Sequence, residues 1–430
     1  MKPHLTIAAT LITATCLFSC REEVDKTEYY TFSETSHDNT AEVTWNPEDF
    51  DFDTANAYYT ENFSELIESG NVGACSSWRN GNYHGRNLDW LQGDFGCLII
   101  KMPKGGKVKH SSVALLNAVS VINRQFLKEG RVTGNDKYLP AVVVDGINDA
   151  GVAININIVP HVAGTPYIQD GDLTSQCVVR YVLDNAGSVD EAIKLLEGRR
   201  ISQDLIALAD DETHYMISDK HSTAVVEFDG YDMVVTRFES NGNGYYSPEG
   251  NPAIMTNMYD YAIERWGFKT QELFENHPLA MGVERWETIR NQYDKAAASV
   301  DSNIGIAKSV WYFQNFMVDK ALWYSENAIP SSYGKDAAGW YYMDDEERVS
   351  CNDHFSAQNG YWKAAMEKYW SDYDTIYGVL PDPHVEDNPF WETSHTVIYD
   401  LDAKKGYLIP FENYYSKDRS HPAPIEITLP

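Results

Sequence analysis

The stretch Cys75–Trp90, CSSWRNGNYHGRNLDW, carries the strongest local structural signal in the chain. Asn80 and Gly81 stand between two strand-like runs, and this dipeptide favours a two-residue hairpin because both residues tolerate a positive φ. If they are the loop residues of a type I′ turn, Cys75 lies directly opposite Arg86. Opposed side chains in such a hairpin are about 5 Å apart at Cβ. The hairpin therefore predicts a guanidinium beside a thiol.

Cys75 has two interpretations at this point. A cationic neighbour favours thiolate over thiol, which activates a cysteine as a nucleophile. The alternative is a small buried hydrophobic residue, the commoner role of a cysteine at the start of a strand. The residues before Cys75 are small, which is compatible with self-cleavage between Ala74 and Cys75. Asp89 faces away from Arg86 on a regular strand, so we expect it to join the group only through a bulge after Asn87.

The amino-terminal end is typical of an exported bacterial lipoprotein. Residues 1–19 start with the positive Lys2 and continue as an apolar run too short to span a bilayer comfortably. They end at Leu17-Phe18-Ser19-Cys20, which resembles a lipobox. We expect Cys20 to be acylated and to anchor the chain in the bacterial cell envelope, with this lipid as its only link to the membrane. The alternative is an ordinary signal peptide with an incidental cysteine.

The rest of the chain divides into a tether, a leader helix and a large α+β body. Residues 20–46 are acidic and aperiodic, which predicts a flexible tether. Apolar residues at helical spacing predict a helix within the leader, residues 47–74. Residues 75–430 predict antiparallel sheets with helices packed outside them. Strands are expected at 97–102, 141–146, 151–159 and between 204 and 238, helices at 173–198 and 260–325, and a Trp/Tyr-rich insertion at 326–392.

Composition excludes several classes of function. The net charge is −30, with 64 acidic residues against 34 Lys and Arg. Such a surface repels phosphate backbones and anionic lipid headgroups, so we expect no nucleic acid partner. Besides Cys16 in the signal and Cys20, the cysteines are widely spread, without metal-ligand spacing or a disulfide pattern: Cys75, Cys97, Cys177 and Cys351. We expect neither a metal nor another cofactor, whereas a homo-oligomer is possible.

Cys75 followed by Gly85-Arg86-Asn87-Leu88-Asp89-Trp90 resembles the opening of the choloylglycine hydrolase group. That group includes bile salt hydrolases and penicillin V acylases, with acid ceramidase and N-acylethanolamine amidase as related enzymes. The resemblance implies an amino-terminal-nucleophile (Ntn) hydrolase fold, a four-layer αββα sandwich of two antiparallel sheets. It also implies that Cys75 becomes the free amino terminus. Arg86 would then favour the thiolate, and Asp89 would hold the new amine.

Further matches follow in the family's order along the chain. The segment 145–157 resembles a strand-turn-strand carrying an asparagine near the scissile amide, which is Asn157, although Asn155 faces the same way. Thr256-Asn257 resembles the segment that carries the oxyanion asparagine. The resemblance gives the late catalytic arginine as Arg285, but Arg265 stands in an identical Glu-Arg-Trp triplet.

The implied activity is hydrolysis of linear amides through a thioester on Cys75, after self-cleavage and without a cofactor. We expect a small-molecule substrate with an apolar acyl group, an N-acyl or fatty acid amide. The alternatives are conjugated bile salts, penicillin V, or an acyl-binding lipoprotein without turnover. The long leader is similar to that of the ceramidase branch, where it remains as a separate small chain. Cys351 with His354 is a less specific alternative, the Cys–His pair of a thiol protease.

Overall fold

The computed structural model describes a large part of the chain on both sides of Cys75. Described are residues 29–37, 40–66, 74–90, 97–117, 136–160, 171–202, 211–229, 232–257, 283–293, 298–310, 392–410 and 423–430, apart from Asn243 and Ser309, together with Lys128 and Ile168. The predicted signal with Cys20, Arg265, Cys351, His354 and nearly all of the insertion at 326–392 lie outside these residues. In the described part, no helix is long and apolar enough to cross a membrane.

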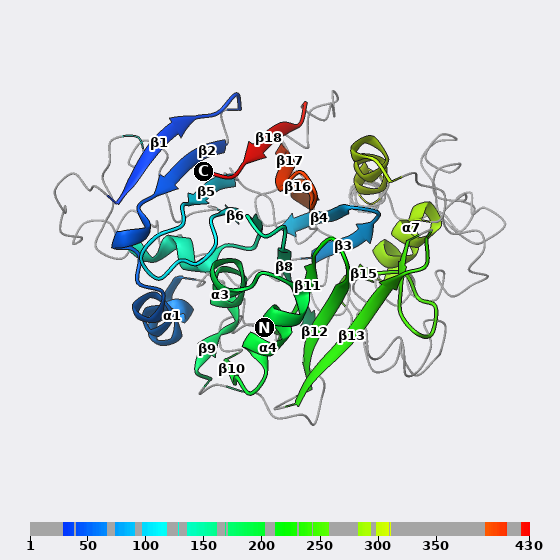
Figure 1. Ribbon diagram of the computed structural model, residues 1–430, viewed down its shortest axis with the longest axis horizontal. Helices are drawn as coiled ribbons and strands as arrows, with labels where there is room; N and C mark the ends of the chain where they lie inside the picture. Colours follow the sequence, from blue (N-terminus) through cyan, green and yellow to red (C-terminus); the bar gives the residue numbers. More distant parts are fainter. Residues whose placement is uncertain are drawn as a thin grey trace, which may run out of the picture.

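Two sheets dominate the molecule (Figure 1). The larger has ten strands, in the order β1 (Tyr30–Glu34), β2 (Thr40–Trp45), β5 (Cys97–Met102), β6 (Ser112–Asn117), β7 (Asp145–Asn148), β8 (Ala153–Pro160), β11 (Asp211–Ser218), β12 (Thr223–Asp229), β13 (Asp232–Ser240) and β14 (Tyr245–Tyr246). The smaller has six, in the order β15 (Ile254–Met255), β3 (Ala74–Asn80), β4 (Tyr83–Trp90), β16 (Glu392–Asp400), β17 (Lys405–Pro410) and β18 (Ile425–Thr428). Every ladder in both sheets is antiparallel except β2 with β5. The predicted α+β class with antiparallel sheets is confirmed.

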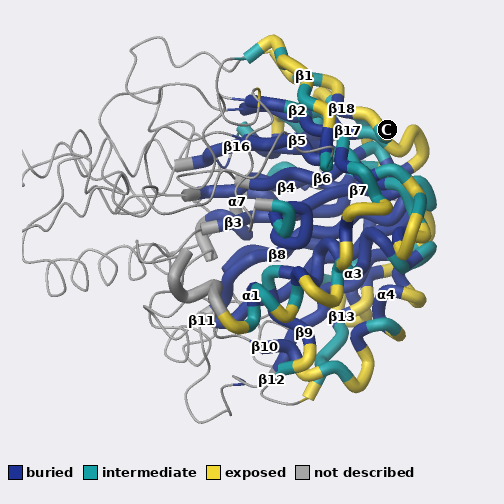
Figure 2. The backbone as a smooth tube through the Cα atoms, turned by 90° about the vertical axis from the view of Figure 1, so that its left-hand side faces the viewer, coloured by how far each residue is buried: buried dark blue, intermediate teal, exposed yellow. Residues whose placement is uncertain are grey.

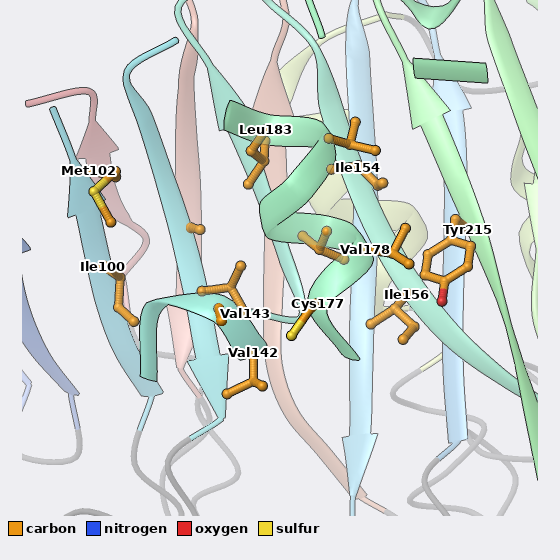
Figure 3. Close-up of a cluster of buried hydrophobic side chains, with 14 of the residues drawn as sticks. Ile100, Met102, Val142, Val143, Ile154, Ile156, Cys177, Val178, Leu183 and Tyr215 are labelled. Carbon is orange, nitrogen blue, oxygen red and sulfur yellow. The ribbon is translucent and has the colours of Figure 1, made fainter. Parts of the chain in front are cut away.

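The outer face of the ten-stranded sheet packs against helices. Side chains alternate between the two faces of a strand, so in β8 Ile154 and Ile156 face outward, with Asn155 between them on the other side. Val178 and Leu183 of α3 (Val178–Asn185) belong to the same apolar core as these isoleucines (Figure 3). The helices α1 (Phe52–Leu66) and α4 (Val189–Leu196) complete this core.

The inner face of this sheet packs on the six-stranded sheet. The central strands of both sheets are buried (Figure 2), whereas β1, β13 and β18 are partly exposed. Two apolar clusters lie between the sheets. One joins Ile99 and Ala153 to Val397 and Tyr399, and the other contains Met216 and Met255. Buried polar side chains lie between the sheets as well. The far side of the six-stranded sheet contacts helix α7 (Val283–Tyr293) through β3 and β15.

The tether prediction for residues 20–46 is wrong over its described part. β1 and β2 lie within it, and β2 pairs with β5 from Thr40↔Cys97 to Thr44↔Lys101. Buried side chains alternate with partly exposed ones along β2, with Glu42 at a partly exposed position. This short amphipathic pattern was hidden by the acidic composition around it. The leader helix, by contrast, is confirmed as α1.

Most of the other predicted elements are present. The run at 97–102 is β5, 151–159 corresponds to β8, and 173–198 contains α3 and α4. Ser188 caps α4 by accepting from the Glu191 N–H at 3.2 Å. The strand expected at 141–146 begins only at Asp145, because Asp136–Val142 is a 3-10 helix containing Pro140.

Candidate active site

The hairpin at Cys75 has a different register from the predicted one. Gly81 and Asn82 form the turn, so Cys75 pairs with Leu88 and Arg86 pairs with Ser77. The predicted type I′ turn at Asn80 and Gly81 is wrong. Gly81 has a φ of +57°, and glycine at the first loop position is typical of a type II′ turn. A Cβ on Gly81 would lie 2.2 Å from Cβ of Ala298, so this position also requires glycine for space.

The predicted contact between thiol and guanidinium is nevertheless present. The register error is two residues, and side chains repeat their facing direction every two residues, so Arg86 stays on the face of Cys75. A long side chain reaches such a diagonal neighbour. Arg86 Nη2 donates to Cys75 Sγ at 3.6 Å. Both residues are buried, Cys75 with 2% of its surface exposed.

Arg86 is held in place by the inner face of the ten-stranded sheet. Its Nη1 donates to Asp145 Oδ2 at 2.5 Å and to the Val144 carbonyl at 2.8 Å. Its Nη2 donates to the Ile156 carbonyl at 2.8 Å. These acceptors aim the guanidinium at the sulfur and leave it little freedom to turn away.

Asp145 is the counter-ion at the back of the site. Tyr399 donates to its Oδ1 at 2.5 Å, and His395 Nε2 lies 3.2 Å from its Oδ2. Burial alone would raise the pKa of Asp145, but Arg86 and these hydrogen-bonding neighbours outweigh it, so the pKa is lowered. For Cys75 burial dominates and raises the pKa of the thiol, with Arg86 opposing the shift and Asp89 adding to it. Cys75 therefore carries a buried thiol with a cation beside it.

Asn257 and Arg285 hold the main chain of Cys75. The Cys75 N–H donates to Asn257 Oδ1 at 2.8 Å, and Arg285 Nη1 donates to the Cys75 carbonyl at 2.9 Å. Arg285 Nη2 also donates to Asn257 Oδ1 at 2.7 Å. Asn257 Nδ2 donates to the Ile158 carbonyl at 2.6 Å. An amide nitrogen carries two hydrogens, so the second remains for an acceptor in the site.

Asp89 joins this group through Arg285. Its Oδ2 lies 3.3 Å from Arg285 Nη1, and its Oδ1 accepts from Thr393 Oγ1 at 2.7 Å. The predicted bulge after Asn87 in β4 is wrong, because the irregularity lies in the neighbouring strand β16, between Thr393 and His395. Arg285 thus links the Asp89 carboxylate, on the far face of β4, to the backbone of Cys75.

Asn157 lies behind Asn257. Its Nδ2 donates to the carbonyls of Met255 and Thr256, both at 3.3 Å, and its Oδ1 accepts from Asn155 Nδ2 at 2.9 Å. The expectation that Asn155 faces the same way as Asn157 is confirmed. Asn157 Oδ1 also accepts from Ser77 Oγ at 3.4 Å, so Asn157 links two side chains to the main chain that carries Asn257. Among the described residues, no group of His, Cys, Asp or Glu could hold a metal ion.

The sequence of this site has a match among known protein families. Residues 75–260 match the family described as linear amide C-N hydrolases, choloylglycine hydrolase family. The segment that carries Cys75, Arg86, Asp89, Asn157 and Asn257 is thus similar to that family. The matched segment begins at Cys75 and ends just beyond Asn257.

More distant comparisons add little. No curated protein sequence is similar enough to the chain to count as a relative. Penicillin V acylase from Agrobacterium tumefaciens is 15% identical with a TM-score of 0.36, over 78% of this chain and 82% of that one. Two variants of the conjugated bile acid hydrolase from Clostridium perfringens are 14% identical with TM-scores of 0.33, over 82% and 83% of this chain and 92% and 98% of theirs. Similarities this low carry no argument about the substrate.

Three residues of this candidate site escaped prediction: Asp145, Thr393 and His395. Asp145 had a usable signal. It follows the apolar run Ala141–Val144 at the start of a buried strand, and a buried carboxylate requires a partner. Thr393 and His395 had none, because they lie more than 300 residues from Cys75 and come close only through the pairing of β16 with β4.

Proposed function

We propose that the chain is a self-processing amide hydrolase with Cys75 as its amino-terminal nucleophile, on a four-layer Ntn-type sandwich. One observation carries the proposal. The Cys75 thiol lies beside the Arg86 guanidinium, while its N–H and carbonyl are held by Asn257 and Arg285. A structural cysteine requires none of these contacts. The layers fit, since helices pack on the outer face of the large sheet and on the far side of the small one.

Self-cleavage would begin at the Ala74–Cys75 peptide bond, which lies inside β3. Sγ attacks the Ala74 carbonyl carbon, the C–N bond breaks, and the acyl group passes from nitrogen to sulfur. Water then hydrolyses the thioester, which leaves a carboxylate on Ala74 and a free amine on Cys75. Asn257 Oδ1 already accepts from the Cys75 nitrogen, so it would hold the amine as it forms.

In turnover the new amine acts as base for its own thiol. A free α-amine has a pKa of about 7.7–8.0 in model compounds, which suits proton transfer near neutral pH. The thiolate attacks the substrate carbonyl, the amine product leaves, and water releases the acid. The second Nδ2 hydrogen of Asn257 would stabilise the oxyanion, an interaction whose loss typically costs about 2.7–4 kcal/mol of barrier. Asp89 and Arg285 would hold the amine and the main chain through this cycle.

The proposed substrate is a linear amide with an apolar acyl group, an N-acyl or fatty acid amide. The support is the family match together with the aromatic-rich sequence at 326–392, which would supply an apolar surface. Conjugated bile salts and penicillin V are the alternatives, and the same assay distinguishes them. We further propose that a lipid on Cys20 holds the enzyme at the bacterial cell envelope.

The leader, taken here as the whole segment between Cys20 and Cys75, would remain bound after cleavage. Its strand β2 pairs with β5, and Trp45, Ala55 and Tyr59 are buried in the core of the outer face. Cutting one peptide bond leaves all these contacts intact. The mature enzyme would thus consist of a small chain ending at Ala74 and a large chain beginning at Cys75.

Intact mass with amino-terminal sequencing tests the proposal on wild type, Cys75→Ala and Cys177→Ala. Cys177 is a matched control because it is also a buried free cysteine, but it lies in the outer core. Wild type and Cys177→Ala should give two fragments, the larger starting at Cys75, and should hydrolyse one class in a panel of N-acyl amides, conjugated bile salts and penicillin V. Cys75→Ala should remain whole and inactive. If the wild-type chain hydrolyses amides while it is uncut, the self-cleavage mechanism is contradicted. If it binds acyl ligands without hydrolysing any of them, the proposed hydrolase activity is contradicted.

A further inference from the structure

A continuous chain of polar side chains crosses the space between the two sheets, next to the nucleophile. It runs from Ser218 on β11 through His84 on β4 to Asn155 and Asn157 on β8. His84 Nδ1 lies 2.9 Å from Ser218 Oγ, and His84 Nε2 lies 2.8 Å from Asn155 Oδ1. Asn155 Nδ2 donates to Asn157 Oδ1 at 2.9 Å. All four side chains are fully or almost fully buried. We call these four residues the inter-sheet polar chain.

The donor and the acceptor of every hydrogen bond in the inter-sheet polar chain can be assigned by starting at Asn157. Backbone carbonyls only accept, so the Asn157 atom that faces Met255 and Thr256 is the amide nitrogen. Asn157 Oδ1 therefore faces Asn155 and accepts, which directs Asn155 Oδ1 toward His84. His84 must then carry its hydrogen on Nε2.

The other ring nitrogen of His84 is an acceptor. Burial lowers the pKa of His84 to about 4, so the ring is neutral near pH 7 and Nδ1 accepts from the Ser218 hydroxyl. Ser218 Oγ in turn lies 3.0 Å from Thr223 Oγ1. Donors therefore point in one direction, from β11 and β12 toward the main chain at Met255 and Thr256.

The inter-sheet polar chain ends at the carbonyl of Thr256, the residue before Asn257. Thr256 O receives Asn157 Nδ2 at 3.3 Å and His214 Nε2 at 2.7 Å. His214 and Asn157 are directly paired in the β8–β11 ladder, so their side chains project from the same face of the ten-stranded sheet. His214 is itself braced by Glu227, whose Oε1 lies 3.1 Å from Nδ1. One carbonyl thus receives two donors from the opposite sheet.

We propose that the inter-sheet polar chain, together with His214, positions Asn257 for the reaction at Cys75. This inference rests on the proposed function. Asn257 reaches the nucleophile from a short segment in which Ile254 and Met255 pair with β3 and the Ala253 carbonyl accepts from the Arg79 N–H at 3.0 Å. The two hydrogen bonds to Thr256 O fix the segment just before Asn257. These four residues and His214 are thus positioning residues, and Asn157 acts through the main chain rather than on the substrate.

A purely structural role fits these observations less well. Other parts of the space between the sheets are filled by apolar clusters, which pack without any requirement for matched donors. A buried polar network is useful only when every member is satisfied, and replacing one by apolar residues is often neutral for stability. Keeping a directional network at this place therefore indicates a geometric requirement.

Two substitutions of His84 distinguish the positioning role from a purely structural one. Glutamine places an amide near the position of Nε2, so His84→Gln keeps the donor to Asn155 and loses the acceptor for Ser218. Asparagine places its amide near Nδ1, so His84→Asn keeps the contact with Ser218 and loses the one with Asn155. Each variant loses one buried hydrogen bond, so both should lower the Tm by similar amounts. Only His84→Asn interrupts the chain on the side of Asn257.

The experiment compares full-length wild type, His84→Gln and His84→Asn in self-cleavage rate, kcat and KM on the amide that wild type hydrolyses. His84→Asn should lower the cleavage rate and kcat by about tenfold or more with little change in KM, since a 1 Å misplacement can cost ~10²-fold. His84→Gln should stay within about threefold of wild type. Equal losses in both variants, or no loss in either, overturn the proposal.

Crystal structures of the two variants give an answer that does not depend on turnover. His84→Asn should shift Asn157 and the Thr256 carbonyl, whereas His84→Gln should leave both in place. If wild type neither cleaves itself nor hydrolyses any amide, the proposed function has failed. The variant structures then still decide whether the inter-sheet polar chain positions Asn257, and unchanged Thr256 and Asn257 in His84→Asn contradict it.

Discussion

The two faces of the ten-stranded sheet each carry a buried Arg–Asp pair, and the pairs differ in their surroundings. On the inner face Arg86 lies 2.5 Å from Asp145, whose carboxylate also accepts from Tyr399 and contacts His395. On the outer, helical side Arg180 lies 3.1 Å from Asp184. Burial raises the pKa of Asp184 to about 6 despite Arg180, whereas the pKa of Asp145 is lowered.

The difference shows what the inner pair is built to do. Arg180 also donates to the Pro140 carbonyl and to Ser112, so it joins α3, the 3-10 helix Asp136–Val142 and strand β6 as a structural clamp. Arg86 uses one nitrogen for Asp145 and presents the other to the Cys75 sulfur. The extra neighbours of Asp145 keep it ionised, and an ionised Asp145 keeps Arg86 fixed beside the thiol. Similar residues thus serve packing on one face and, in the proposed function, chemistry on the other.

The largest effect is expected from Arg86→Met. Removing the cation leaves Asp145 buried without its main partner, which typically costs about 3–5 kcal/mol. Self-cleavage and turnover should be lost as well, because no other described cation donates to Cys75 Sγ. Urea unfolding and intact mass measure the two effects. Adding Asp145→Leu should recover part of the stability and none of the activity.

Arg180→Met is the matched control on the outer face. It should destabilise the protein by a comparable amount and leave self-cleavage of the folded fraction near the wild-type rate. If both single variants lose cleavage in proportion to their stability, the functional distinction between the faces does not hold.

The chain's local signals predicted much of this architecture but not its exact pairing. The Asn-Gly dipeptide located the hairpin, and the alternation of side chains placed Arg86 on the face of Cys75. The two-residue register error came from assigning the turn to Asn80 and Gly81. In the structure the space beside Gly81 is limited by Ala298, which is more than 200 residues away in the sequence. No local pattern contains that constraint.

The missed features share one physical cause, which is dependence on contacts distant in sequence. β2 is six residues long and gains its stability from β5, so its acidic neighbourhood concealed it. Asp89 is connected to the main chain of Cys75 by Arg285, which lies about 200 residues further along the chain. Asn157 was predicted as a catalytic residue near the scissile amide, whereas its described side chain lies behind Asn257 and donates to the carbonyls of Met255 and Thr256, which no spacing argument provides.

The leader is the next region expected to respond. Trp45→Ala should cost about 3–5 kcal/mol, because this fully buried side chain stacks on Tyr30 in the outer core. After self-cleavage the variant's small chain should dissociate more readily, which native size exclusion of the cleaved protein would measure. Glu42→Gln, at a partly exposed position of the same strand, should retain the small chain. Retention in Trp45→Ala, with unchanged stability, would contradict a packed leader.

The lowered pKa of His84, which lies between the two sheets, predicts that the stability of the folded protein depends on pH. Its pKa is about 4 in the folded protein, against 6.5 for an ordinary histidine. The unfolded chain therefore takes up a proton first, and stability is lost as pH falls from about 6.5 to about 4, by about 3 kcal/mol in total. His84→Gln should remove this slope in urea unfolding at several pH values. Asp184 titrates in part of this range with the opposite sign, so the difference between wild type and variant is the informative quantity.

The smallest effect is expected on the outer face, at the start of α4. Ser188 caps this helix by accepting from the Glu191 N–H, and Ser188→Ala should cost about 1 kcal/mol. Kcat and the cleavage rate should not change, because α4 contacts the outer face and none of the described site contacts includes it. Gly187 N–H donates to Glu191, so Glu191→Gln, which keeps an acceptor, should cost less than Ser188→Ala. Loss of activity in Ser188→Ala at full folding would mean that the outer helices communicate with Cys75, and the separation of the two faces would be wrong.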